Sequence, residues 1–129
     1  MPLVIQVLPG EFAIARLAAD APVPAWAESS AFGSTTRTAT ELSVLCPARQ
    51  VPAGVKAEAG WRVLRLRGPF AFTETGILSS VLDPLAFSRI SILAVSTFDT
   101  DYVLVKGAAL EAALRTLRHA GHTVETEPA

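Results

Sequence analysis

Short runs in which apolar residues alternate with polar or β-branched ones recur along this chain, and they predict strands more often than helices. The runs end at turn-forming residues such as Pro9-Gly10 and Pro47, where proline cannot donate to a strand ladder. Residues 90–98 are apolar on both faces, which predicts a strand covered on both sides inside a sheet. The predicted strands are residues 3–8, 11–17, 32–38, 41–46, 61–67, 90–98, 102–106 and 122–125.

Apolar residues at helical spacing predict two helices in the second half of the chain. Thr75 is the expected N-cap of the first helix, and Pro84 inside it predicts a kink rather than two helices. Gly121 suits the position that ends the second helix. The apolar stripe of the first helix is Ile77, Leu78, Val81, Leu82 and Leu85. The stripe of the second helix is Leu110, Ala113, Leu114 and Leu117.

The order of these elements predicts an α+β fold. The second half runs strand, helix, strand, strand, helix, strand, which is the βαββαβ order of ferredoxin-like folds, with two helices on one face of an antiparallel sheet. The first half repeats part of this order, since residues 40–45 align with residues 100–105, but it lacks most of the helices. Residues 50–60 are the expected linker. We therefore expect a reduced subdomain in residues 1–58 and a complete one in residues 59–129.

Composition narrows the class of protein. The chain has 129 residues, is 50% hydrophobic and carries a net charge of −1, which predicts neither a nucleic-acid partner nor a membrane surface. Its apolar runs are shorter than the roughly 20 residues that cross a bilayer. The single cysteine, Cys46, cannot form an internal disulfide, and Pro9-Gly10 interrupts any secretory leader. We expect a soluble, cytoplasmic protein.

Several segments resemble ACT domains, most closely the branch that includes the CASTOR-type arginine sensors and small bacterial tandem-ACT proteins. They are Gly60-Trp61-Arg62, Gly68-Pro69-Phe70, Thr75-Gly76-Ile77-Leu78 and, above all, residues 96–105. The chain departs from the family pattern where Ser88-Arg89 replaces glycine after the first helix. The resemblance implies two ferredoxin-like ACT subdomains in tandem, the first reduced. It also implies a regulatory, non-catalytic homodimer that binds a free amino acid at a subdomain or dimer interface and signals to a protein partner.

The resemblance places the ligand between the loop that opens the first helix and the segment before the next hairpin strand. The expected site residues are Thr73, Glu74, Thr75, Gly76, Ile77, Ser96, Thr97, Asp99, Thr100 and Asp101. Physical reasoning supports this place, because an α-carboxylate binds free amides at a helix N-terminus and an ammonium group binds carboxylates. The alternative interpretation is that Thr75 only caps, Gly76 only turns and the aspartates only bind hairpin amides.

Other functional residue types lack the partners that chemistry would need. His119 and His122 have no third metal ligand nearby and are expected in solvent, and Cys46 is expected to be buried and inert. We find no nucleophile motif and no phosphate loop, so we expect neither catalysis nor a cofactor. Two other functions remain open. One is a ligand-free interaction module that dimerises through residues 90–98, and the other is an enzyme, which would rest on fold analogy alone.

Overall fold

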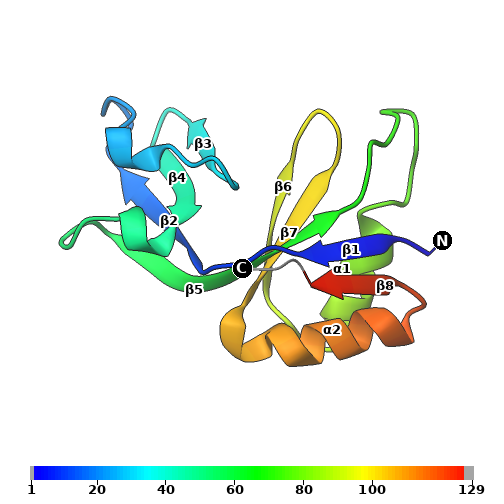
Figure 1. The fold of residues 1–129 in the computed structure, drawn as a ribbon. Coiled ribbons are helices and arrows are strands. Elements are labelled where there is room, and N and C mark those ends of the chain that lie inside the picture. The colour runs from blue at the N-terminus through cyan, green and yellow to red at the C-terminus, as the bar shows by residue number, and fades with distance from the viewer. Residues whose placement is uncertain (1, 127–129) are drawn as a thin grey trace. The chain divides into compact units, whose positions relative to one another are not determined.

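The N-terminal strand pairs with the second half of the chain and not with its neighbours in sequence. In the computed structural model, which describes residues 2–126, β1 (Val4–Val7) is antiparallel to β5 (Ala57–Leu66) and parallel to β8 (Thr123–Thr126) (Figure 1). The contacts group the chain into two units. The main unit is Met1–Pro9 with Arg62–Ala129, and the inserted unit is Gly10–Trp61.

The main unit is one mixed sheet with two helices. Its strand order is β6-β7-β5-β1-β8, with β6 antiparallel to β7. The sequence predicted purely antiparallel sheets, and the parallel β1–β8 pair corrects that expectation. The remaining elements of this unit are α1 (Ser79–Phe87), β6 (Ile92–Ser96), β7 (Asp101–Lys106), the 3₁₀ turn Gly107–Ala109 and α2 (Leu110–His119).

Both helices pack against the same face of this sheet, which is where the core lies. Alternate strand residues point to one face, and the helices cover them with their own apolar stripes. This arrangement confirms the predicted mixed α+β architecture of the second half. The buried contributors include Ile5, Val7, Leu64, Leu66, Val103 and Val105 from the strands and Val81, Leu85, Leu114 and Leu117 from the helices.

The inserted unit is built on antiparallel strands and has no α-helix among its described residues. The strand order is β3-β4-β2-β5, of which residues 57–61 of β5 belong to this unit. Its core includes Cys46, which is fully buried as expected, and burial raises the pKa of this thiol. Its elements are β2 (Phe12–Leu17), the 3₁₀ turn Ala25–Ala27, β3 (Ser34–Arg37), β4 (Leu42–Pro47) and the 3₁₀ turn Ala48–Gln50.

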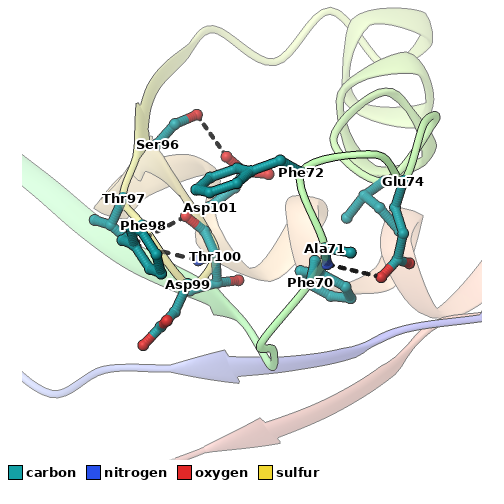
Figure 2. Close-up of a pocket in the computed structure, with 11 residues that line it drawn as sticks. Phe70, Ala71, Phe72, Glu74, Ser96, Thr97, Phe98, Asp99, Thr100 and Asp101 are labelled. Atoms are coloured by element: carbon teal, nitrogen blue, oxygen red, sulfur yellow. Dashed lines mark hydrogen bonds between the residues drawn. The ribbon is translucent and has the colours of Figure 1, made fainter.

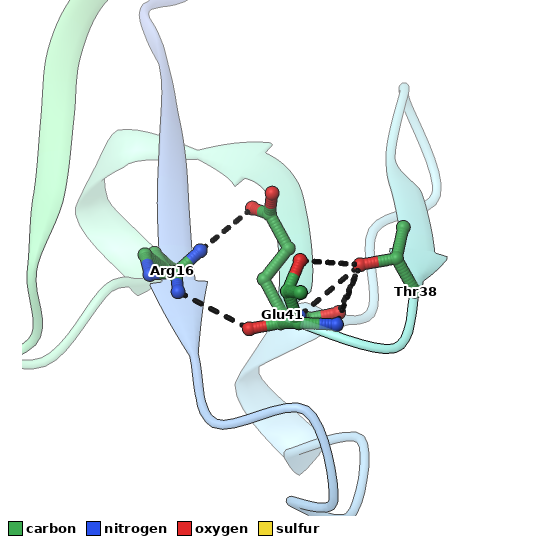
Figure 3. Close-up of polar contacts among 4 residues, drawn as sticks. Arg16, Thr38 and Glu41 are labelled. Atoms are coloured by element: carbon green, nitrogen blue, oxygen red, sulfur yellow. Dashed lines mark hydrogen bonds and ion pairs between the residues drawn. The ribbon is translucent and has the colours of Figure 1, made fainter.

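The turn between β3 and β4 is held by side chains. Thr38 Oγ1 accepts hydrogen bonds from the amides of Thr40 and Glu41, at 3.2 and 3.1 Å (Figure 3). Arg16 on β2 then donates to the Thr40 carbonyl at 3.1 Å and pairs with the Glu41 carboxylate at 3.4 Å. The predicted hairpin is therefore present. The proposal that this unit is a reduced ACT-like subdomain stays a prediction, and the two contact units do not follow the expected boundary after residue 58.

Three local expectations were wrong. The expected linker at residues 50–60 ends early, because β5 begins at Ala57. The strand expected at residues 90–98 is shorter and is not covered on both sides, since among the described strands β6 pairs only with β7 and keeps partly exposed residues. His122 is buried, with 6% of its surface exposed. Its Nδ1 accepts a hydrogen bond from the Leu3 amide at 3.1 Å, and its Nε2 lies 2.9 Å from the Ser80 carbonyl.

The ends of the helices explain the position of His122. Gly121 adopts a left-handed conformation, with φ of +100°, as its predicted role at the end of α2 requires. The amide of His122 then donates to the Leu117 carbonyl at 3.1 Å. The turn directs the His122 imidazole toward Ser80 of α1. Because Nδ1 accepts the hydrogen bond of the Leu3 amide, Nε2 carries the proton and donates to the Ser80 carbonyl.

Candidate functional site

The loop after β5 is fixed against the turn between β6 and β7. The Phe70 amide donates to the Asp99 carbonyl at 2.9 Å. A Cβ atom at Gly68 would lie 2.8 Å from that same carbonyl oxygen and 3.1 Å from the Thr100 Cβ. Only glycine fits such an approach without a shift of the backbone. The structure therefore brings together the two segments that the sequence predicted to face each other.

The turn itself is stabilised from within and from β5. The Thr97 amide donates to the Thr100 carbonyl at 2.8 Å, and the Thr97 hydroxyl lies within hydrogen-bond distance of the amide and the carbonyl of Thr100. The buried Thr100 hydroxyl donates to the Leu66 carbonyl. Ser96 Oγ donates to Asp101 Oδ1 at 2.5 Å. These bonds hold the turn in one conformation above the end of β5.

A pocket of about 220 Å³ lies between the loop and the turn, entirely within the main unit (Figure 2). Of the predicted site residues, Glu74, Ile77, Ser96, Thr97, Asp99, Thr100 and Asp101 line it. Thr73, Thr75 and Gly76 do not line it. Sequence reasoning missed Phe70, Ala71, Phe72 and Phe98, which complete the lining. The presence of Phe72 and Phe98 in the two predicted loops was the one sequence signal for this part of the pocket. It was not sufficient, because the residue type alone does not tell whether a phenylalanine is exposed or buried.

The helix beside the pocket begins later than predicted. Thr75 is not its N-cap, because α1 begins at Ser79 after Leu78, and no side chain caps it. Gly76 has φ of +77° with no atom within 4 Å of a Cβ position, so its role is conformational and not close approach. The Gly76 carbonyl accepts the Ser80 amide at 3.1 Å. Ile77 lines the pocket, and within residues 2–126 its amide donates no hydrogen bond.

The pocket is acidic and aromatic. Its lining includes Glu74, Asp99 and Asp101 and, among residues 2–126, no basic residue. The Asp101 carboxylate lies beside Phe72, while that of Asp99 points away from the loop (Figure 2). Glu74 Oε1 accepts the Ala71 amide at 3.0 Å, which orders the loop and leaves the second carboxylate oxygen available. At the rim, the rings of Phe72 and Phe98 pack edge to face with centroids 5.1 Å apart, although they are 76% and 79% exposed. Carboxylates and aromatic rings are both groups that bind cations.

The described residues hold no group of three His, Cys, Asp or Glu side chains that could bind a metal ion. No helix within residues 2–126 is long and apolar enough to cross a bilayer.

The arrangement around the pocket is suited to holding a small cationic or zwitterionic molecule, with donors at the helix entrance and acceptors on the turn.

Residues 56–119 match the family model described as the ACT domain. The chain belongs to the ACT domain family. The ACT match includes the loop, the turn and both helices, and therefore every residue of the pocket. Residues 10–54, most of the inserted unit, match a second family model that describes an N-terminal domain. The resemblance predicted from the sequence is thereby confirmed.

Known relatives of this ACT domain protein include a cytosolic arginine sensor. Over 66 residues the chain is 39% identical to subunit 1 of the cytosolic arginine sensor for mTORC1 from Bos taurus. The aligned region covers 47% of this chain and 20% of that protein. The chain thus spans about one fifth of the length of this curated relative. A crystal structure of a protein from Agrobacterium tumefaciens is 42% identical, with all of this chain and 96% of that chain covered and a TM-score of 0.95.

The fold is shared with regulatory parts of aspartate kinases. The regulatory subunit of aspartate kinase from Thermus thermophilus, in its ligand-free form, superimposes with a TM-score of 0.60 at 11% identity. The alignment covers 86% of this chain and 91% of that subunit. At this identity the likeness concerns the fold alone.

Proposed function

We propose that this ACT domain protein is a non-catalytic regulatory protein that binds a free amino acid in the pocket between the loop after β5 and the β6–β7 turn. The observation that carries the proposal is the set of three carboxylates without a basic neighbour, combined with two exposed aromatic rings at the rim. A ligand with a cationic side chain suits this lining, because it would replace the missing counter-charge. One relative is named as an arginine sensor, so arginine is the first ligand to test.

Each end of such a ligand has a candidate partner. The amide of Ile77, beside the N-terminal end of α1, would bind the α-carboxylate, since helix N-termini favour anions. The guanidinium would lie against the carboxylate of Asp101 and the face of Phe72 or Phe98. The ligand would then join the loop to the turn. A protein of this kind is expected in the cytoplasm, as its relative's name indicates for that protein.

Calorimetric titration of the full chain with arginine, lysine, leucine and glutamate tests the proposal. We expect heat and a rise in melting temperature with arginine or lysine, weaker effects with leucine, and none with glutamate, which the carboxylates would repel. Absence of both signals with every standard amino acid would refute it. Asp101→Asn should weaken binding, while Asp83→Asn, which changes an exposed carboxylate of α1 outside the pocket, should not.

A second candidate function is a ligand-free module that dimerises through its sheet. The strand β6 favours it, because within residues 2–126 this strand pairs on one side only, and it has the uncharged sequence Ile-Leu-Ala-Val-Ser. The substitution Leu93→Asp would convert a dimer into a monomer, as measured by sedimentation. A dimer that dissociates in this way, in a protein that binds no amino acid, would favour the second function over the first.

A further inference from the structure

A second hollow of the main unit lies at the far end of α1 from the amino-acid pocket. It is a groove between the C-terminal ends of α1 and α2, with a volume of about 440 Å³, against about 220 Å³ for the pocket. Ser88 and Thr116 join the two helices there through a hydroxyl–hydroxyl hydrogen bond of 3.1 Å. The lining residues are Pro84, Phe87, Ser88, Arg115, Thr116, His119 and Ala120.

Phe87 gives the groove an apolar anchor point. It is the last residue of α1 and is 91% exposed, while Val81 and Leu85 of the same helix are fully buried. Covering an exposed phenylalanine is favourable, because its apolar surface is removed from water. Pro84 and Ala120 add further apolar surface next to the ring.

The charged side chain that lines the groove is the basic Arg115. The imidazole of His119 also lines it, and no carboxylate of residues 2–126 does. Basic residues in the last turn of a helix commonly complement the helix dipole, which explains Arg118 and His119. Arg115 lies before that turn, and it forms no ion pair with any residue between 2 and 126. The dipole therefore does not account for Arg115.

Arg89 follows Ser88 of the groove in the sequence and brings a second guanidinium, in an unfavourable backbone conformation. It has φ of +57°, the left-handed region that is typical of glycine after a helix. The Ile90 amide donates to the Leu85 carbonyl at 3.0 Å and closes this turn. An L-residue is disfavoured relative to glycine in this region, so the chain keeps a guanidinium where its backbone would favour glycine.

We propose that this groove binds an acidic segment of a partner protein. An apolar side chain of the segment packs on Phe87, and its carboxylates face Arg89 and Arg115. A second copy of the chain fits less well, because a two-fold symmetric contact would bring these cations toward their own equivalents. The proposal is independent of the amino-acid site, since no residue lines both hollows.

Selection from a library of random dodecapeptides on the full-length protein tests this, followed by fluorescence anisotropy with the enriched peptides. We expect enriched peptides to combine several Asp or Glu residues with one large apolar residue. Phe87→Ser should weaken their Kd by about 10-fold or more, as loss of a central anchor does. Arg115→Glu should weaken it by about 10-fold at low salt, and by less at high salt, where exposed charges are screened.

Matched variants outside the groove separate a local effect from a general one. Val23→Ser removes a partly exposed apolar residue and Arg49→Glu reverses an exposed charge, both in the inserted unit, and neither should change the Kd. Circular dichroism would show that each variant is folded.

Four results would overturn the proposal. The first is enrichment of peptides without acidic residues, and the second is equal binding to wild type and both groove variants. The third is a dimer that Phe87→Ser dissociates, which would assign the groove to a second copy. The fourth is binding to phosphatidylserine vesicles that Arg115→Glu abolishes, with no peptide enriched, which would assign it to an anionic lipid surface.

Discussion

The contact between the loop after β5 and the β6–β7 turn can be tested by adding one methyl group. In Gly68→Ala the new Cβ would lie 2.8 Å from the Asp99 carbonyl oxygen, 3.1 Å from the Thr100 Cβ and 3.2 Å from the Phe70 nitrogen. Two of these atoms belong to the backbone, and Thr100 is buried, so no flexible side-chain end can move aside. The loop must therefore shift, and the hydrogen bond between Phe70 and Asp99 must lengthen.

The expected cost follows from that geometry. Overpacking by one carbon typically destabilises a protein by about 1–3 kcal/mol. In a chain of this size each kcal/mol corresponds to about 4 °C in melting temperature. Urea denaturation should show the lower stability. Calorimetry with arginine should also show weaker binding, because the same shift separates the two walls of the pocket.

Two other glycines serve as controls. A Cβ at Gly33 would find its nearest atoms at 3.5 Å, which is ordinary contact, so Gly33→Ala should have little effect. Gly76 has open space around a Cβ but φ of +77°, so Gly76→Ala should cost about 1 kcal/mol through its backbone alone. If Gly68→Ala were as stable as Gly33→Ala, the close packing of loop and turn described above would be wrong.

The remaining predictions concern three side chains. Asp101→Asn should weaken arginine binding by about 5-fold, because one partly exposed ion pair contributes about 1 kcal/mol, and unchanged calorimetry would remove Asp101 from the site. His122→Phe should lower the free energy of unfolding by about 2 kcal/mol, since it leaves two buried backbone groups unpaired. The exposed His119 is its control, and an equal effect of His119→Phe in urea denaturation would contradict the structural role. Arg89→Gly should raise stability by about 0.5–1 kcal/mol while weakening binding of acidic peptides, and a less stable variant would refute the strain at this residue.

The sequence predicted local structure well wherever one periodic pattern decided it. Every predicted strand appears within a few residues, and the stripe of α2 from Leu110 to Leu117 is a helix with its apolar side buried. The strand at Ala57 was missed at its start because Gly54 and Gly60 suggested a linker. A ladder to β2, formed by residues distant in sequence, overrides that local preference.

Pairing between distant segments could not be predicted in the same way. Nothing in residues 4–7 indicates that they lie between β5 and β8, because any half-buried strand has such a pattern. The same limit applies to His122, whose burial depends on the Leu3 amide and the Ser80 carbonyl. Most polar residues of the pocket could be predicted from their family positions, but the exposed pair Phe72 and Phe98 could not, since sequence gives residue type and not exposure.

Helix α1 lies between the two proposed sites, and this position makes a quantitative prediction. The loop that lines the pocket leads into the N-terminal end of α1, and the last residue of α1, Phe87, lines the groove. With nine residues it is about 14 Å long. If arginine in the pocket shifts α1, it changes the affinity of the groove for an acidic peptide. Linkage then requires the peptide to change the affinity for arginine by the same factor. Calorimetric titrations in both orders measure the two factors. Equal factors different from one would show that α1 couples the sites, and factors of one would show that the two sites act independently.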